Sequence, residues 1–250
     1  MKKLYEKSEI WFSVIWIVLY VVLLSNADSI SEQLGVQKSV TAPLCVIMAA
    51  VLLGFVFKNG LAEKYGLCVM KGHAGRYLMF VPLIALSTVN FWNGVTMNMT
   101  VAETALYIIS MLCVGFIEEI IFRGFLFKAM AKDNVKSAII VSSLTFGIGH
   151  IVNLLNGEEL LATLLQVCYA VAMGYLFTII FHKSGSLIPC ILAHSFVNST
   201  SVFGREQTPR QQIIISAVLA VGALVYALVI LALNRNKMVS SAEPTPQITE

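Results

Sequence analysis

Long runs of apolar residues, separated by short polar segments, dominate the chain. A helix needs about 20 mostly apolar residues to cross a bilayer. Eight runs approach this length: residues 10–24, 39–57, 77–93, 104–127, 137–156, 160–181, 187–203 and 211–234. The pattern predicts an all-α fold, a polytopic membrane helix bundle of about eight transmembrane helices. In the first run, Trp11, Trp16 and Tyr20 are typical of side chains that anchor a helix at the membrane interface.

The composition supports a membrane protein and excludes other classes. Of the 250 residues, 58% are hydrophobic and 12% are charged, whereas soluble proteins contain about 25% charged residues. So few charged side chains cannot cover a water-soluble globule. The formal net charge of +3 is too small to indicate a nucleic-acid partner. We therefore expect membrane lipid around the chain and no nucleic acid bound to it.

Basic residues are distributed unequally between the two sets of loops. Cytoplasmic loops retain more Lys and Arg than outer loops do. Of the 17 basic residues, Lys38, Arg205 and Arg210 lie in one set of loops and Arg123 lies inside a span. The other thirteen share the opposite side: Lys2, Lys3, Lys7, Lys58, Lys64, Lys71, Arg76, Lys128, Lys132, Lys136, Lys183, Arg235 and Lys237. This asymmetry predicts that both termini are cytoplasmic.

The predicted spans divide the chain into four parts. Residues 1–100 carry the first three transmembrane helices, residues 101–204 carry the next four, and residues 205–234 carry the last. Residues 235–250 include Pro244 and Pro246 and predict a disordered cytoplasmic tail. The first run has a second interpretation, because an apolar stretch followed by Ser25-Asn26-Ala27 also fits a cleaved secretory signal. The family resemblance given below favours retention of this helix.

Charged and polar side chains inside the spans concentrate in three of them. An ionised group deep in a bilayer costs at least about 2.5–3.5 kcal/mol, so such groups are usually paired or functional. From the helical rise, Glu118, His150 and His194 lie about 15, 21 and 17 Å from the lysine of the nearest basic loop. These similar depths predict one shared site, reached from the cytoplasmic side. Its candidate residues are Glu118, Glu119, Arg123, His150, His194 and Asn198.

Spacing separates the roles of these residues. Glu119 and Arg123 are four residues apart on one helical face, which predicts an ion pair. Glu118 has no such cation and is the candidate base. We expect the glycines on either side of Ile148 to let another helix approach closely. Other polar residues are expected outside the site, either solvated in loops (His73, His182, Glu158 and Glu159) or packed against helices (Gln166 and Tyr169).

Three motifs carry a family resemblance. Glu118-Glu119-x-x-x-Arg123, Phe146-x-x-x-His150 and His194-x-x-x-Asn198 follow one another in successive predicted spans, and the segment 185–194 reads GSLIPCILAH. Together they resemble the CPBP family, the CAAX proteases and bacteriocin-processing enzymes also called the Abi family. The similar region runs from about residue 103 to residue 198.

The resemblance implies an intramembrane endopeptidase. It implies that Glu118 and His150 activate a water, that His194 and Asn198 stabilise the oxyanion, and that Glu119 and Arg123 support them. The implied substrate is a hydrophobic peptide or a membrane-tethered protein, such as a pheromone or bacteriocin precursor or a CAAX-like protein. The small size and the absence of a long soluble insert resemble the prokaryotic branch, which implies a bacterial plasma membrane.

A metal and a non-catalytic function are the two alternatives. Glu118, His150 and His194 are acceptable zinc ligands, but no His-Glu-x-x-His motif is present. An ion pair with Arg123 would also occupy Glu119. We therefore favour a glutamate-type hydrolase without a cofactor, with zinc as the alternative. A Glu-His cluster in the membrane also suits a proton relay, so a bacteriocin immunity protein or a small transporter is the alternative function.

Overall fold

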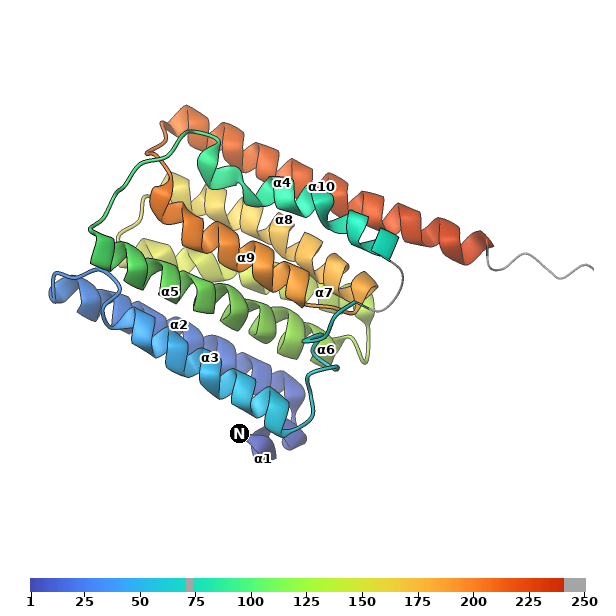
Figure 1. Ribbon diagram of the computed structural model, residues 1–250. Helices are drawn as coiled ribbons and strands as arrows, with labels where there is room; N and C mark the ends of the chain where they lie inside the picture. The colour runs from blue at the N-terminus through green and yellow to red at the C-terminus, as the bar shows by residue number, and fades with distance from the viewer. Residues whose placement is uncertain (71–73, 241–250) are drawn as a thin grey trace, which may run out of the picture.

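The computed structural model describes residues 1–70 and 74–240 and forms a helical bundle (Figure 1). The helices are α1 (Lys2–Lys7), α2 (Glu9–Gln33), α3 (Thr41–Lys58), η1 (Ala74–Phe80), α4 (Val81–Ser87), η2 (Val89–Phe91), α5 (Val101–Glu118), η3 (Glu119–Phe127), α6 (Lys128–Met130), α7 (Val135–Gly149), η4 (His150–Asn156), α8 (Leu160–Ser184), α9 (Ile188–Thr200), η5 (Ser201–Phe203) and α10 (Pro209–Ser240). Within these ranges the β structure is one isolated bridge, between Val95 and Gly204. The predicted all-α class is confirmed.

Six helical segments are long and apolar enough to cross a membrane. They are Glu9–Gln33, Thr41–Lys58, Val101–Met130, Val135–Asn156, Leu160–Ser184 and Pro209–Leu233. The other two predicted spans correspond to shorter apolar helices, Tyr77–Phe91 and Ile188–Phe203. The polytopic helical bundle is thus confirmed, while the count of eight spans stays a prediction.

The last helix continues past the predicted end of its span. We expected the helix to stop at residue 234, but α10 runs to Ser240, so residues 235–240 of the expected tail are helical. The rest of that tail, residues 241–250, lies outside the described residues.

The loops gather at two ends of the bundle (Figure 1). One end, called here the basic end, holds residues 1–8, 58–70, 128–134 and 185–187. The other, called the opposite end, holds residues 34–40, 92–100, 157–159 and 204–208. Because α5 and α9 run in opposite directions between them, the C-terminal part of α5 lies beside the N-terminal part of α9.

Two glycines allow the helices around the candidate site to pack closely. A Cβ added to Gly115 on α5 would lie 2.5 Å from the backbone nitrogen of Ser195 on α9, and one added to Gly147 on α7 would lie 2.7 Å from that of Val171 on α8. The close approach expected near Ile148 is therefore confirmed for Gly147. It is wrong for Gly149, because no heavy atom of the described residues lies within 4 Å of a Cβ added there.

Candidate active site

The helix that carries the two glutamates changes its winding between them. α5 ends at Glu118, and the chain continues without a break as the π-helix η3. All nine residues of η3 are buried. The Ser142 hydroxyl on α7 donates to the backbone carbonyl of Phe122, 2.8 Å away, and joins η3 to the next helix. π-Helices are rare and occur frequently at functional sites, so this change of winding agrees with a functional site at the two glutamates.

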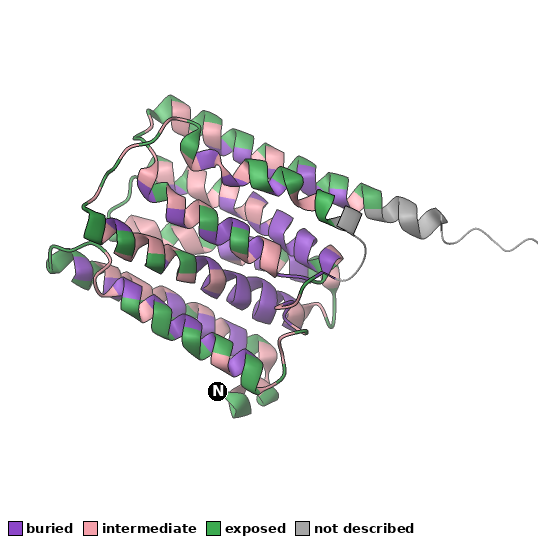
Figure 2. Cartoon of the chain, viewed as in Figure 1, coloured by how far each residue is buried: buried purple, intermediate pink, exposed green. Residues whose placement is uncertain are grey.

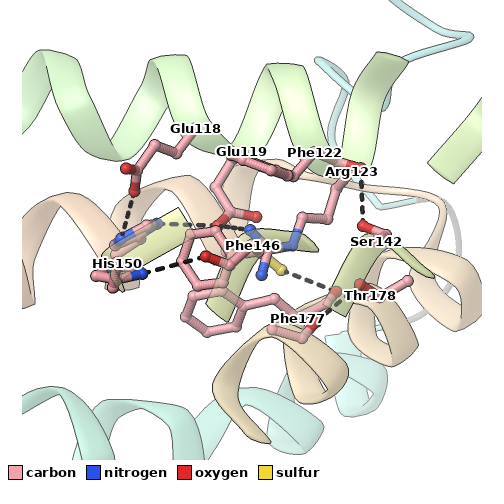
Figure 3. Close-up of polar contacts among 12 residues, drawn as sticks. Glu118, Glu119, Phe122, Arg123, Ser142, Phe146, His150, Phe177 and Thr178 are labelled. Carbon is pink, nitrogen blue, oxygen red and sulfur yellow. Dashed lines mark hydrogen bonds and ion pairs between the residues drawn. The ribbon is translucent and has the colours of Figure 1, made fainter. Parts of the chain in front are cut away.

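Glu119 and Arg123 form the predicted ion pair in a sealed part of the bundle. Arg123 Nη1 lies 3.0 Å from Glu119 Oε1, and neither side chain is exposed (Figure 3). The guanidinium carbon lies 4.1 Å from the ring centroid of Phe146, close enough for a cation–π contact. Gly174 leaves room for this arrangement, since a Cβ there would lie 3.0 Å from Arg123 Nη2. The pair is a closed structural unit.

His194 on α9 joins the two glutamates. Its Nδ1 lies 2.9 Å from Glu119 Oε1, and its Nε2 lies 3.3 Å from Glu118 Oε2. The ring is 8% exposed. With Arg123 donating to the same Glu119 oxygen, that carboxylate is an acceptor, so Nδ1 of His194 donates to it. Nε2 can then also act as a donor only when the ring is doubly protonated.

Glu118 faces a different environment from its neighbour. Its Oε1 accepts a hydrogen bond from the Tyr20 hydroxyl, 2.6 Å away, and the residue is 8% exposed. Among the described residues no Lys or Arg forms an ion pair with Glu118, and the charged partner it can have is His194. Glu118 therefore remains available to accept a proton.

Tyr20 is a site residue that the sequence interpretation missed. We expected Trp11, Trp16 and Tyr20 to be interfacial anchors, and of these Trp11 is 64% exposed. Trp16 and Tyr20 are 9% and 7% exposed and face the bundle. A tyrosine hydroxyl within an apolar span needs a hydrogen-bond partner. This requirement could have indicated from the sequence that Tyr20 contacts a polar group inside the bundle.

His150 lies at the junction of α7 and η4. Its Nδ1 lies 3.1 Å from the backbone carbonyl of Phe146 (Figure 3). A carbonyl only accepts, so Nδ1 carries the hydrogen, and in the neutral ring Nε2 is the acceptor. A general base at this position would therefore act through Nε2.

A polar cavity of about 340 Å³ brings the predicted residues together. Glu118, His150 and Asn198 line it, and His194 contacts Glu118 at its edge. Gln166 and Tyr169, which we expected mainly as helix contacts that could also line the site, do line it. Lining residues that the sequence interpretation did not include among the site residues include Tyr20, Asp28, Lys38, Asn90 and Tyr107.

The polar residues that we expected in solvated loops lie away from this cavity where the structure describes them. His182, Glu158 and Glu159 are exposed near helix ends, as expected. His73 lies outside the described residues. None of the three described residues is among those that line the cavity.

The direction of access differs from the prediction. We expected the site to open to the basic end, but the cavity extends from Glu118 toward the opposite end, as far as Asn156 and Ser201. Between Glu118 and the basic end, all residues of η3 are buried. The helical rise gives the distance from each site residue to the nearest loop lysine. It does not show which half of the bundle is closely packed, and the packing decides where the cavity opens.

Zinc is the alternative cofactor predicted for this site. Within residues 1–70 and 74–240, no group of three His, Cys, Asp or Glu side chains is arranged to hold a metal ion. No step of the chemistry below is derived through zinc.

Comparison with known proteins supports the family resemblance. Residues 100–200 match the family model described as Type II CAAX prenyl endopeptidase Rce1-like. The matched segment contains all six predicted site residues. Searches of curated proteins and of solved structures find no significant match. The resemblance is thus confirmed: the chain is an integral membrane protein whose residues 100–200 match the Rce1-like type II CAAX prenyl endopeptidases.

Proposed function

We propose that the chain is a glutamate-type intramembrane endopeptidase that cleaves a hydrophobic peptide or a membrane-tethered protein. The observation that carries this proposal is that Glu118, His150 and Asn198 from α5, α7–η4 and α9 line one polar cavity, with His194 in contact with Glu118. Placing four such groups within apolar spans is costly, and a shared chemical task accounts for the cost.

Two pairs of residues divide the chemical work, one pair in proton transfer and the other in stabilising the oxyanion. Glu118, with His150, accepts a proton from a water while the water oxygen attacks the carbonyl carbon of the scissile bond. Negative charge then develops on the carbonyl oxygen, and it is stabilised by the Asn198 amide and by Nε2–H of His194 in its doubly protonated form. The carbon–nitrogen bond breaks, and the proton held by Glu118 passes to the leaving amine. Each oxyanion donor of this kind lowers the barrier by roughly 3–4 kcal/mol.

An apolar groove supports a membrane-associated substrate. The groove has a volume of about 800 Å³ and lies between α2 and α7–η4. Val21, Gly149 and Val152 line both the groove and the polar cavity. The apolar part of a substrate can therefore stay in lipid beside the groove while its peptide bond enters the cavity.

Two substitutions test the proposal directly. Glu118→Gln and His150→Ala remove the proton acceptors and are expected to lower kcat by about 10²–10⁴-fold. Cleavage is measured in detergent with a prenylated CAAX peptide and with an unlipidated hydrophobic peptide. Glu159→Gln, on an exposed loop, is the matched control and should retain full activity.

Wild-type cleavage by both site variants would refute the endopeptidase proposal. The alternative immunity function makes the contrary prediction. A protein that protects by binding should still protect cells when Glu118 is replaced by Gln.

A further inference from the structure

The cavity at the candidate site lies in one half of the bundle. Along α5 it is lined from Glu118 back to Tyr107, a distance of about 16 Å toward the N-terminus of that helix. On α8 its lining residues belong to the first half of the helix, and on α9 to the last turn. These parts of α5, α8 and α9 all lie toward the opposite end (Figure 1). The cavity therefore occupies the half of the bundle next to that end.

The other half of the bundle is closed. Every residue from Glu119 to Phe127 on η3 is buried, and so is every residue from Leu176 to Phe181 on α8. In Figure 2, buried residues concentrate on the parts of α5–η3, α8 and α9 that lie toward the basic end. Phe122 and Phe146 line the cavity at the level of the glutamates and also belong to this packed core. The described residues therefore offer a water or a peptide no comparable path from the basic end.

The rim at the opposite end is polar and held in place. Lys38 Nζ lies 2.8 Å from Asp28 Oδ1, and both residues line the cavity. Thr41 donates to the same carboxylate oxygen. Lys38 has a φ of 62° and is the one non-glycine residue with a positive φ among those described. Such sparsely populated conformations cluster at active sites and ligand-binding segments. Asn156 and Ser201 complete the rim and are exposed.

The distribution of basic residues places this rim relative to the membrane. Among the described residues, the segments of the basic end hold seven basic residues, whereas those of the opposite end hold Lys38 and Arg205. The seven are Lys2, Lys3, Lys7, Lys58, Lys64, Lys128 and Lys132. Loops rich in basic residues stay cytoplasmic. We infer that the reaction chamber opens to the outer face of the membrane, past Asp28 and Lys38, and receives a hydrophobic polypeptide whose cleavage site lies on that face. The substrate part of this inference rests on the proposed function, whereas the direction of opening does not.

Cysteine labelling tests the direction of opening. Ser201→Cys and Asn156→Cys place a thiol on the rim, and Lys132→Cys places one at the basic end, where the lysine side chain is 57% exposed. All three are made in a background without the native cysteines. A membrane-impermeant maleimide added to intact cells should label the two rim variants, and Lys132→Cys only after permeabilisation. The reverse pattern, or rim labelling only after permeabilisation, would overturn the inference.

The labelled proteins also show whether the rim is the way in. After labelling and transfer to detergent, the rim variants should lose most of their cleavage of the prenylated peptide, while labelled Lys132→Cys keeps it. Full activity of the labelled rim variants would contradict entry past this rim.

Sealed vesicles separate the inference from the proposed function. An impermeant hydrophobic peptide should be cleaved by right-side-out vesicles and not by inside-out vesicles until detergent is added. Cleavage only by inside-out vesicles would refute the inference and leave the endopeptidase proposal intact. No cleavage in any preparation, detergent included, would refute the endopeptidase proposal, while the labelling result would still decide the direction of opening.

Discussion

Glu118 and Glu119 are adjacent in the chain but lie in opposite surroundings. Glu119 is unexposed and paired with Arg123 at 3.0 Å, whereas Glu118 borders a polar cavity and has only His194 as a charged partner among the described residues. Glu118 is the last residue of α5, and Glu119 is the first residue of η3. The comparison indicates that one carboxylate is built into the structure while its neighbour is kept available for a proton.

The largest expected effect is a difference in protein stability between the variants of these two carboxylates. Glu119→Gln leaves Arg123 buried without its charge partner, which is expected to lower the free energy of unfolding by about 3–5 kcal/mol. Glu118→Gln keeps a group that can still accept from Tyr20, so unfolding should change little. Thermal unfolding of both variants in detergent measures the difference, and equal stabilities would contradict the assignment.

A double substitution sharpens the same contrast. Replacing both members of a buried pair by apolar residues is often neutral, so Glu119→Leu with Arg123→Met should recover much of the lost stability. His194 would still lack its Nδ1 partner, so cleavage should remain lost. Recovery of cleavage in the double variant would show that Glu119 has no role in positioning His194.

A smaller effect is expected from the helix contact beside the carboxylates. Gly115→Ala would place a Cβ 2.5 Å from the backbone of Ser195, and such overpacking costs typically about 1–3 kcal/mol. It should also displace His194 from Glu118 and reduce cleavage. Gly149→Ala is the matched control, because its added Cβ contacts none of the described atoms within 4 Å. Similar melting temperatures for the two variants would contradict the close α5–α9 packing.

Tyr20→Phe should reduce turnover without changing the fold. A hydrogen bond to a charged group contributes about 1.5–3 kcal/mol, so loss of this bond to Glu118 is expected to lower kcat by about tenfold or more. KM should change little, because Tyr20 acts through the carboxylate. Tyr65→Phe also removes a buried hydroxyl, which donates to Tyr5 near the basic end, and serves as the control. Equal kinetics for the two variants would contradict a role for Tyr20.

The smallest expected effect is that of a chelator. Since the three expected zinc ligands lack a metal-binding arrangement, purified activity should survive extended treatment with EDTA. Loss of activity that added zinc restores would require a different arrangement of Glu118, His150 and His194.

Much of the fold and of the site could be predicted from the order of apolar runs and polar interruptions. Each predicted run corresponds to a helix or to adjoining helical segments, because burying backbone polar groups in lipid leaves few other choices. The Glu119–Arg123 pair followed from a spacing of four residues on one helix. These features depend on local periodicity, which a single sequence carries.

Features that depend on distant contacts could not be predicted in this way. Nothing in the residues of η3 announces a π-helix, since its winding depends on what α2 and α7 pack against it. Tyr20 lies 98 residues before Glu118, and no local pattern joins them. The direction of the cavity depends on which half of the bundle is closely packed. Residue spacing along a single helix does not reveal this, because the packing involves several helices.

The position of Tyr20 in α2 has a consequence for biogenesis. α2 runs without interruption through Ser25-Asn26-Ala27, the segment that could also serve a signal peptidase. Its Tyr20, Ser25 and Asp28 form one wall of the chamber. A protein trimmed at that point would lose Tyr20 and this wall. We therefore predict that the first helix is retained, and N-terminal sequencing of active material should find that helix still attached.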